Sequence, residues 1–468
     1  MEKENKMGTQ PILKLILSMS VPAMFSMLVQ AMYNVVDSFF VAQMGEAALT
    51  SVSLAFPMQM LMISVAVGTG VGLNSLISRR LGEKRQEDAN CAATQGLLLG
   101  IFSWLVFAIL GLVAAGPFMR AFTQDAQIQQ MGIDYLQVVL IFSFGSFLQV
   151  NMEKTLQATG NMLYPMFSQL IGAVTNIVLD PIMIFGLFGF PKLGVKGAAV
   201  ATVLGQILGM CFCLYVVFFK KHQVKISLRR YKIDGPVIKQ IYAVGFPSII
   251  MQAIGSVTNV CMNAILIAFS DAAVSVLGVY FKLQSFVFMP VFGLNQGVMP
   301  IMGYNYGARR KDRLMSALKY GTMIAVGVMA IGTVLFWTLP EAMLHIFNAS
   351  PAMMEIGPKA FRLISLCFLP AAAGIMFSSI FQAVGMGGKS LLISLLRQLI
   401  VLVPVGFLLS KLGLVYVWYA WPIAEVISLL ASIFILQRVY KTRLQYLDAR
   451  EISEEMPLEA VEELIVEE

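Results

Sequence analysis

The chain has 468 residues, of which 58% are hydrophobic and only 13% are charged. Soluble domains carry about 25% charged residues, so the composition excludes a soluble enzyme and predicts an all-α integral membrane protein. The net charge of +7 belongs to short loops, and without a soluble basic domain it does not indicate binding to nucleic acid.

Long apolar stretches with almost no charge mark the membrane-spanning helices, because a span needs about 20 mostly apolar residues. Along the chain we expect twelve spans, at residues 13–42, 52–78, 92–118, 133–157, 162–188, 195–219, 240–269, 274–302, 316–339, 361–383, 390–410 and 413–437.

The two halves of the chain repeat each other at a fixed offset of 225 residues. The matches include Pro22 with Pro247, Gln59 with Gln284, Gly68 and Gly72 with Gly293 and Gly297, and Gln157-Ala-Thr-Gly160 with Gln382-Ala-Val-Gly385. Six spans in each half give the two repeats the same orientation, as in transporters built from parallel repeats. The GxxxG spacing of the two glycine pairs predicts close helix approach.

The distribution of Lys and Arg predicts the topology. Of these 33 residues, 26 fall on the side of the two termini, with Lys154 among them, and 6 on the other side. Positive residues stay in the cytoplasm, so we expect both termini in the cytoplasm of a bacterial cell, with the chain in its cytoplasmic membrane. The expected parts are an N-lobe (1–219), a basic linker (220–239), a C-lobe (240–440) and an acidic tail (441–468).

The first span carries one charge, Asp37, in otherwise apolar sequence. A carboxylate inside a membrane helix costs several kcal/mol to keep ionised, so it is a functional candidate by default. Asn34 lies one turn before it, on the same face of the helix. We interpret the rest of the chain as a scaffold that gives Asp37 partners and access to both sides.

The fifth and sixth spans add further polar pairs at i, i+4 spacing. Asn176 and Asp180 share a face of the fifth span, and Thr202 and Gln206 share a face of the sixth. Two carboxylates with amide and hydroxyl oxygens form a set suited to Na⁺ or to H⁺. For Thr202 and Gln206 the alternative is hydrogen bonding that only holds helices together.

The second half does not copy this set, since Met262 stands at the repeat position of Asp37. Its polar candidates are Lys282 and Gln284 in the eighth span, Arg397 in the eleventh and Glu425 in the twelfth. Lys282 and Glu425 either pair or line a cavity, or Lys282 extends its ammonium group to the membrane surface. The asymmetry predicts that the first half handles the coupling cation.

The motifs of the chain resemble those of the MATE (multidrug and toxic compound extrusion) transporters, and most of all their MepA-like bacterial branch. The similar motifs are Tyr33-Asn34-Val-Val-Asp37, Gln157-Ala-Thr-Gly160, Asn176-Ile-Val-Leu-Asp180-Pro181, Gly197-Ala-Ala-Val-Ala-Thr202, Lys282-Leu-Gln-Ser-Phe and Gly303-Tyr-Asn-Tyr-Gly307-Ala-Arg309. They occur in the family's order over residues 10–440.

The resemblance implies two six-helix lobes that form a V, and efflux of hydrophobic, often cationic compounds driven by H⁺ or Na⁺ through alternating access. It implies a cation or proton site at Asp37, Asn176, Asp180 and Thr202, with no cofactor other than the coupling ion. Tyr33, Asn34, Gln206, Lys282, Gln284, Arg397 and Glu425 are expected to support that site or the substrate cavity. We expect a monomer that contacts small-molecule substrates and lipid.

Two other classes of function were weighed. A flippase for lipid-linked precursors, in the same superfamily, needs a cationic cavity for its pyrophosphate, whereas the charges inside the spans are mostly acidic here. A membrane enzyme or sensor needs a nucleophile, a metal cluster or a soluble effector domain, and the sequence offers none of these.

Overall fold

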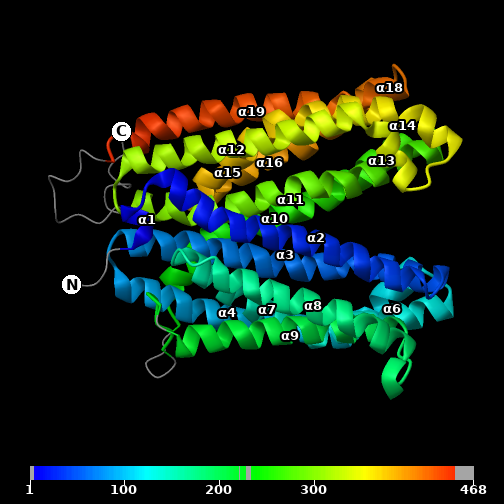
Figure 1. Cartoon of the computed structure of the whole chain (residues 1–468), viewed down its shortest axis with the longest axis horizontal. Coiled ribbons are helices and arrows are strands. Elements are labelled where there is room, and N and C mark those ends of the chain that lie inside the picture. Colours follow the sequence, from blue (N-terminus) through cyan, green and yellow to red (C-terminus); the bar gives the residue numbers. More distant parts are fainter. Residues whose placement is uncertain (1–4, 221, 228–232, 448–468) are drawn as a thin grey trace.

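The computed structural model describes residues 5–220, 222–227 and 233–447, and within these ranges the regular structure is helical (Figure 1). The first part contains α1 (Lys6–Thr9), α2 (Ile12–Ala42), α3 (Glu46–Gly82), α4 (Gln86–Val113), α5 (Ala115–Phe122), α6 (Ala126–Ile141), α7 (Phe144–Ala158), α8 (Leu163–Phe185), η1 (Leu187–Gly189) and α9 (Val195–Phe219). The second part contains α10 (Gly235–Ile267), α11 (Asp271–Gly307), α12 (Lys311–Thr338), α13 (Pro340–Ile346), α14 (Pro351–Ile364), η2 (Ser365–Cys367), α15 (Phe368–Ala383), α16 (Gly387–Leu395), η3 (Leu396–Leu402), α17 (Val403–Ser410), α18 (Leu414–Val417), α19 (Ala420–Val439) and η4 (Tyr440–Leu444).

The predicted spans are confirmed. Within the described ranges, eleven helices or joined helices are long and apolar enough to cross a membrane, and the bent pair α6–α7 makes a twelfth. The predicted fourth span, residues 133–157, was expected to be continuous, but the chain bends there by 44°. At the bend the carbonyl oxygen of Ile141 accepts a hydrogen bond from Trp104 Nε1 at 2.8 Å, so a side chain satisfies a backbone group there.

Several helices extend beyond the predicted spans. The second span was expected at residues 52–78, whereas α3 runs from Glu46 to Gly82 and includes Arg79 and Arg80 in its last turn. Hydropathy detects only the apolar part of a helix, and charged residues near its ends do not interrupt the backbone hydrogen bonds.

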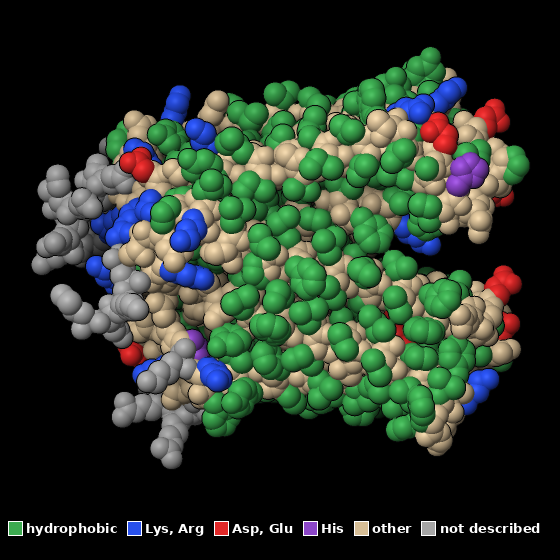
Figure 2. All heavy atoms as spheres, in the orientation of Figure 1, with side chains coloured by type: hydrophobic (Ala, Val, Ile, Leu, Met, Phe, Trp, Pro, Cys, Tyr) green, Lys and Arg blue, Asp and Glu red, His purple; other side chains and the backbone are tan. Residues whose placement is uncertain are grey.

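Helices α2 to α9 pack into a first bundle, and α10 to α19 pack into a second (Figure 1). The two bundles meet where α2 packs along α11, and α3 along α10 and α11. Figure 2 shows a cleft between them that opens at the end of the molecule opposite the chain termini. The expected V of two bundles is confirmed.

Glycines allow the two bundles to approach each other closely at two separate helix contacts. A Cβ atom on Gly72 of α3 would overlap the carbonyl oxygen of Ile241 on α10, and one on Gly297 of α11 would overlap Ser20 on α2. Gly68 faces Ile249 in the first contact, and Gly293 faces Met24 in the second. Met24 and Ile249 are themselves 225 positions apart, so the sequence repeat is also a repeat of contacts.

A short N-terminal strap, residues 5–10, crosses the closed end of the cleft. Asn5 Nδ2 donates to the carbonyl oxygen of Thr159 in the first bundle at 3.2 Å. Arg313 Nη2, in the second bundle, donates to the carbonyl oxygens of Met7 at 3.0 Å and Gln10 at 2.7 Å. The strap therefore joins the two bundles, through the Asn5 side chain on one side and through its own backbone carbonyl groups on the other.

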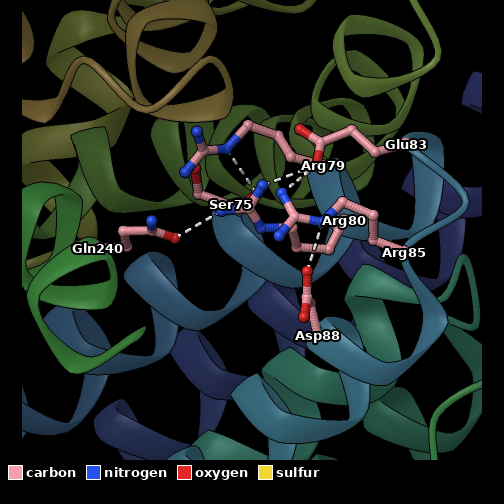
Figure 3. A network of polar contacts seen from close by, with 7 residues as sticks. All are labelled: Ser75, Arg79, Arg80, Glu83, Arg85, Asp88 and Gln240. Atoms are coloured by element: carbon pink, nitrogen blue, oxygen red, sulfur yellow. Dashed lines mark hydrogen bonds and ion pairs between the residues drawn. The ribbon is translucent and has the colours of Figure 1, made fainter. Parts of the chain in front are cut away.

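The end of α3 adds a polar network at the same end of the molecule (Figure 3). Arg80 pairs with Glu83 on its own helix at 2.7 Å and donates to Gln240 Oε1 on α10 at 2.9 Å. Arg79 Nε donates to the carbonyl oxygen of Ser75 at 3.2 Å. The contact between Arg80 and Gln240 again links the first bundle to the second.

The predicted acidic tail, residues 441–468, falls outside the described residues from position 448 onward. The described beginning of that segment continues the last span as η4. Of the predicted basic linker, residues 221 and 228–232 are likewise outside the description.

We predict that Gly72→Ala destabilises the protein by about 1–3 kcal/mol, the usual cost of forcing extra atoms into a packed interface. The measurement is the midpoint of thermal unfolding in detergent. The control is Gly327→Ala on α12, where a Cβ atom meets nothing within 4 Å and where alanine favours the helix. Equal midpoints for the two variants would contradict the proposed close contact.

Candidate functional site

The two predicted carboxyl groups of the first bundle meet. Asp37 projects from α2 and Asp180 from α8, and the two side chains lie beside each other. Asp37 Oδ1 is buried and has no hydrogen-bond partner among the described residues. Asp180 is fully buried, with 0% of its surface exposed. Two ionised carboxylates this close repel each other, so a proton or a cation on the pair would stabilise it.

Asn176 holds the Asp180 carboxyl group in place. Its amide nitrogen donates to Asp180 Oδ2 at 2.8 Å, and its amide oxygen accepts from Thr202 Oγ1 and from the Thr202 backbone nitrogen, both at 3.1 Å. Asn176 and Thr202 are only 2% and 6% exposed. The predicted cation set of four residues is therefore brought together from α2, α8 and α9.

Two tyrosines complete the surroundings of the carboxyl pair. Tyr33, one turn before Asp37 on α2, lies beside Thr202. Tyr135 of α6 lies near Asp37, Asp180 and Tyr33, and its hydroxyl group donates to Gln59 Oε1 at 3.2 Å. Sequence reasoning missed Tyr135, because a lone tyrosine in an apolar span carries no signal that separates it from packing residues.

Hollows lie on both sides of the pair. Asp37 lines a pocket of about 230 Å³ between α2 and α3, with Ser38, Ser53 and Phe56 among its other residues. Tyr33, Asn176 and Thr202 line a separate cavity of about 90 Å³. The carboxyl groups and the oxygens of Asn176 and Thr202 are all hard donors, and such a set can hold either H⁺ or Na⁺.

Gln206 and Asn34 differ in their relation to the site. Gln206 lines the 90 Å³ cavity, as expected, and its Oε1 atom is buried without a hydrogen-bond partner. Asn34 was expected to support Asp37, but it is exposed and its Oδ1 accepts from Gln30 Nε2 at 3.3 Å. The spacing of three residues is compatible with a shared face, but the Asn34 amide group pairs with Gln30 on its own helix and not with the carboxyl pair.

In the second bundle, Glu425 pairs with Arg397, with 3.6 Å between Oε1 and Nη1. The expected alternative of a Lys282–Glu425 pair is therefore wrong. Lys282 is exposed and its Nζ lies 5.9 Å from the centre of the Phe347 ring, a cation–π contact. Gln284 is half-buried on the same helix, α11.

Arg397 owes its place to irregular backbone. It lies in η3, a π-helical stretch between α16 and α17, and such stretches re-aim side chains and occur often at functional sites. The Tyr280 hydroxyl group and the Cys367 thiol, 3.9 Å apart, lie beside Glu425. No sequence pattern predicted the π-helix.

The structure also buries a charged pair that the sequence analysis did not consider. Lys154 was counted among the positive residues on the side of the termini, although it lies within the predicted fourth span (133–157), and Glu153 was not singled out. Both are in α7, where they are only 8% and 3% exposed. The available signal was two adjacent opposite charges at the end of an apolar stretch. Such a pair also occurs at solvated helix ends, and hydropathy cannot tell a buried helix end from a solvated one.

We predict that Thr202→Val lowers the free energy of unfolding by about 1 kcal/mol, because Asn176 loses a buried hydrogen-bond donor. Thr202→Ser, which keeps the hydroxyl group, is the matched control and is expected to stay close to the wild type. Thermal unfolding in detergent measures both. A valine variant as stable as the serine variant would show that the Thr202 hydroxyl does not hold Asn176.

We further predict that Arg397→Met destabilises the protein by up to about 3 kcal/mol, because it leaves the Glu425 carboxylate without its partner. Adding Glu425→Gln to this variant removes the unpaired charge and is expected to recover most of the loss. The measurement is again the unfolding midpoint. No recovery in the double variant would mean that Arg397 stabilises the bundle by packing and not by charge.

The comparisons with known proteins bear on the family and the fold. The MatE family model matches residues 22–182 and 247–408. The multidrug export protein MepA of Staphylococcus aureus is 25% identical over 431 residues, which are 91% of this chain and 94% of MepA. A multidrug resistance MATE family transporter solved in the outward-facing conformation is 28% identical, with a TM-score of 0.89 over 96% of this chain and 99% of that one.

A MATE transporter crystallised with MaL6 is also 28% identical, with a TM-score of 0.88, and the match covers 94% of this chain and 100% of that one. Both repeats of the chain are matched by the family model, together more than half of its length. The chain belongs to the MATE family of transporters.

Proposed function

We propose that this transporter is a cation-coupled antiporter that exports hydrophobic, often cationic compounds by alternating access. The observation that supports the proposal most is the closeness of two carboxyl groups, Asp37 and Asp180, inside the first bundle. The name of the MepA relative, a multidrug export protein, supports the class of substrate.

The cleft between the bundles supports transport from one side to the other. It opens away from the termini (Figure 2), and the excess of Lys and Arg near the termini favours a cytoplasmic location for them. On that topology the cleft faces outward. We propose that the lobes are residues 1–219 and 240–440, that they move as units around the contacts at the closed end, and that the protein works as a monomer.

The Asp37–Asp180 contact supports H⁺ as an occupant of the pair in this conformation, and the oxygen set also accommodates Na⁺. Binding of either ion neutralises charge that the buried site must otherwise hold. Pro22 lies inside α2, about four turns before Asp37 and toward the closed end. Proline removes a backbone hydrogen bond, and a helix can bend at that point. Bending of α2 would close the first bundle around the ion and release the substrate.

We predict that Asp37→Asn abolishes gradient-driven transport, because an amide cannot exchange a proton and binds Na⁺ more weakly than a carboxylate does. The assay is movement of ethidium, a fluorescent hydrophobic cation, in liposomes that contain purified protein. A pH gradient alone and a Na⁺ gradient alone are imposed in turn, so that the effective gradient identifies the coupling ion.

Asp312→Asn, an exposed position in the first turn of α12, is the matched control and is expected to transport like the wild type. Normal ethidium transport by Asp37→Asn at equal protein levels would overturn the coupling mechanism. No ethidium movement by folded wild-type protein under either gradient would favour a lipid flippase instead.

A further inference from the structure

Glu153 is a buried carboxylate that lies outside the carboxyl pair. It is in α7, five residues before the helix ends at Ala158, and is 3% exposed. At 1.5 Å per residue it lies only about 8 Å from that helix end, which is the end near the N-terminal strap. Asp37, by contrast, is about 37 Å along α2 from Ile12, toward the open cleft.

Helix α8 has a row of residues on one face that extends from the Asp180 carboxyl group to the Glu153 carboxyl group. Its residues Gln169, Ala173, Asn176 and Asp180 are spaced by four, three and four positions, so they share one face. Asp180 belongs to the pair with Asp37, while Gln169 Nε2 donates to Glu153 Oε2 at 3.1 Å. Ala173, between them, has too small a side chain to fill the space.

Helix α9 packs against this face of α8 and has a corresponding row of residues on its own face. Thr202, Gln206, Gly209 and Cys213 have the same four, three, four spacing. Thr202 binds Asn176, and Cys213 is close to Glu153. Gly209 matters through its missing side chain, because a Cβ atom there would overlap the amide group of Gln149.

The 90 Å³ cavity lies between these rows. Its lining includes Gln149, Gln169, Asn176, Thr202 and Gln206. The Oε1 atoms of Gln169 and Gln206 are buried and have no hydrogen-bond partner in the protein. A polar cavity of this volume holds a few water molecules, and unpartnered carbonyl oxygens are the groups that such waters bind.

Two of the residues that line the cavity, Gln149 and Gln169, donate to the Glu153 carboxylate. Gln149 Nε2 donates to Glu153 Oε1 at 3.0 Å and to Ser168 Oγ, also at 3.0 Å. The titratable side chains that face Glu153 are Lys154 on its own helix and Cys213 on α9, and α8 presents the neutral Ser168 and Gln169. Glu153 thus has donors for its ionised form and one cation beside it.

Lys154 connects this position to the second bundle. Its Nζ donates to Gln157 Oε1 at 3.0 Å and to Gln296 Oε1 of α11 at 2.9 Å. The ammonium group is therefore satisfied by neutral oxygens at the junction of the bundles, and it does not have to give up its charge when Glu153 becomes neutral.

We propose that Glu153 is a second proton-binding carboxylate of the transport cycle, which exchanges the coupling proton between the Asp37–Asp180 pair and the side of the termini. An O–H bond of the carboxyl pair breaks, the proton moves along water in the 90 Å³ cavity, and an O–H bond forms on the Glu153 carboxylate. The pair is left with one more negative charge and Glu153 becomes neutral. The inference rests on the proposed function in its proton-coupled form.

The test variant is Glu153→Gln, and its matched control is Glu87→Gln, an exposed position in the first turn of α4. In ethidium transport driven by a pH gradient, we expect Glu153→Gln to be slowed by at least about tenfold, the lower range for loss of a proton-transfer group. Ethidium exchange without any gradient is expected to persist, because substrate binding does not use Glu153. Glu87→Gln is expected to match the wild type in both assays.

A second variant leaves both carboxylates untouched. Ala173→Leu fills the cavity between Asp180 and Glu153, and we expect it to reproduce the loss of gradient-driven transport. This variant also provides the test if Glu153→Gln does not fold. Gradient-driven transport at the wild-type rate and with the wild-type pH profile in either folded variant, while Asp37→Asn is inactive, would overturn the role of Glu153 and leave the proposed function intact.

An infrared titration of the protein in lipid tests Glu153 without transport. We expect a pH-dependent C=O band of a protonated carboxylic acid that is present in the wild type and in Glu87→Gln and absent in Glu153→Gln. An unchanged set of bands in Glu153→Gln would contradict the proposal. If wild-type protein moves no ethidium but shows this band, the proposed substrate class is wrong and the assignment of Glu153 remains supported.

Discussion

The cost of placing a carboxyl group away from water governs the first bundle. Asp180 is fully buried, so its oxygens need a proton, a cation or donors from the protein. The structure supplies a second carboxyl group, Asp37, and one amide, Asn176. These groups are sufficient to stabilise a pair that a proton or a cation has neutralised, but they are too few to stabilise two ionised carboxylates. The state of charge and the packing of α2 against α8 are therefore tied to each other.

The junction between the bundles depends on glycines, which have no side chain, whereas the first bundle depends on buried carboxyl groups. Gly72 and Gly297 allow backbone to approach backbone in two equivalent places, and polar groups such as Arg80 and Gln240 surround them at the closed end. Because the junction is narrow and built of small residues, the two bundles can separate from each other toward the open end of the cleft. The cleft and the carboxyl pair thus lie on the side where the bundles are separate.

The sequence was sufficient for the spans, the repeat and the residues that meet around Asp180, because apolar length, fixed spacing and a charge in an apolar stretch are local signals. Three features escaped it. The bend between α6 and α7 depends on a hydrogen bond from Trp104, a residue 37 positions away from Ile141. The partner of Glu425 depends on a π-helix at Arg397. The burial of Glu153 depends on how α7, α8 and α9 pack together.

The N-terminal strap sets an order for the assembly of the protein. Met7 is hydrogen-bonded to Arg313, 306 residues later in the chain. During synthesis the first residues emerge long before their partners, and eight spans precede Arg313. The closed end can form only after α11 is in the membrane, and such distant contacts are slow to make.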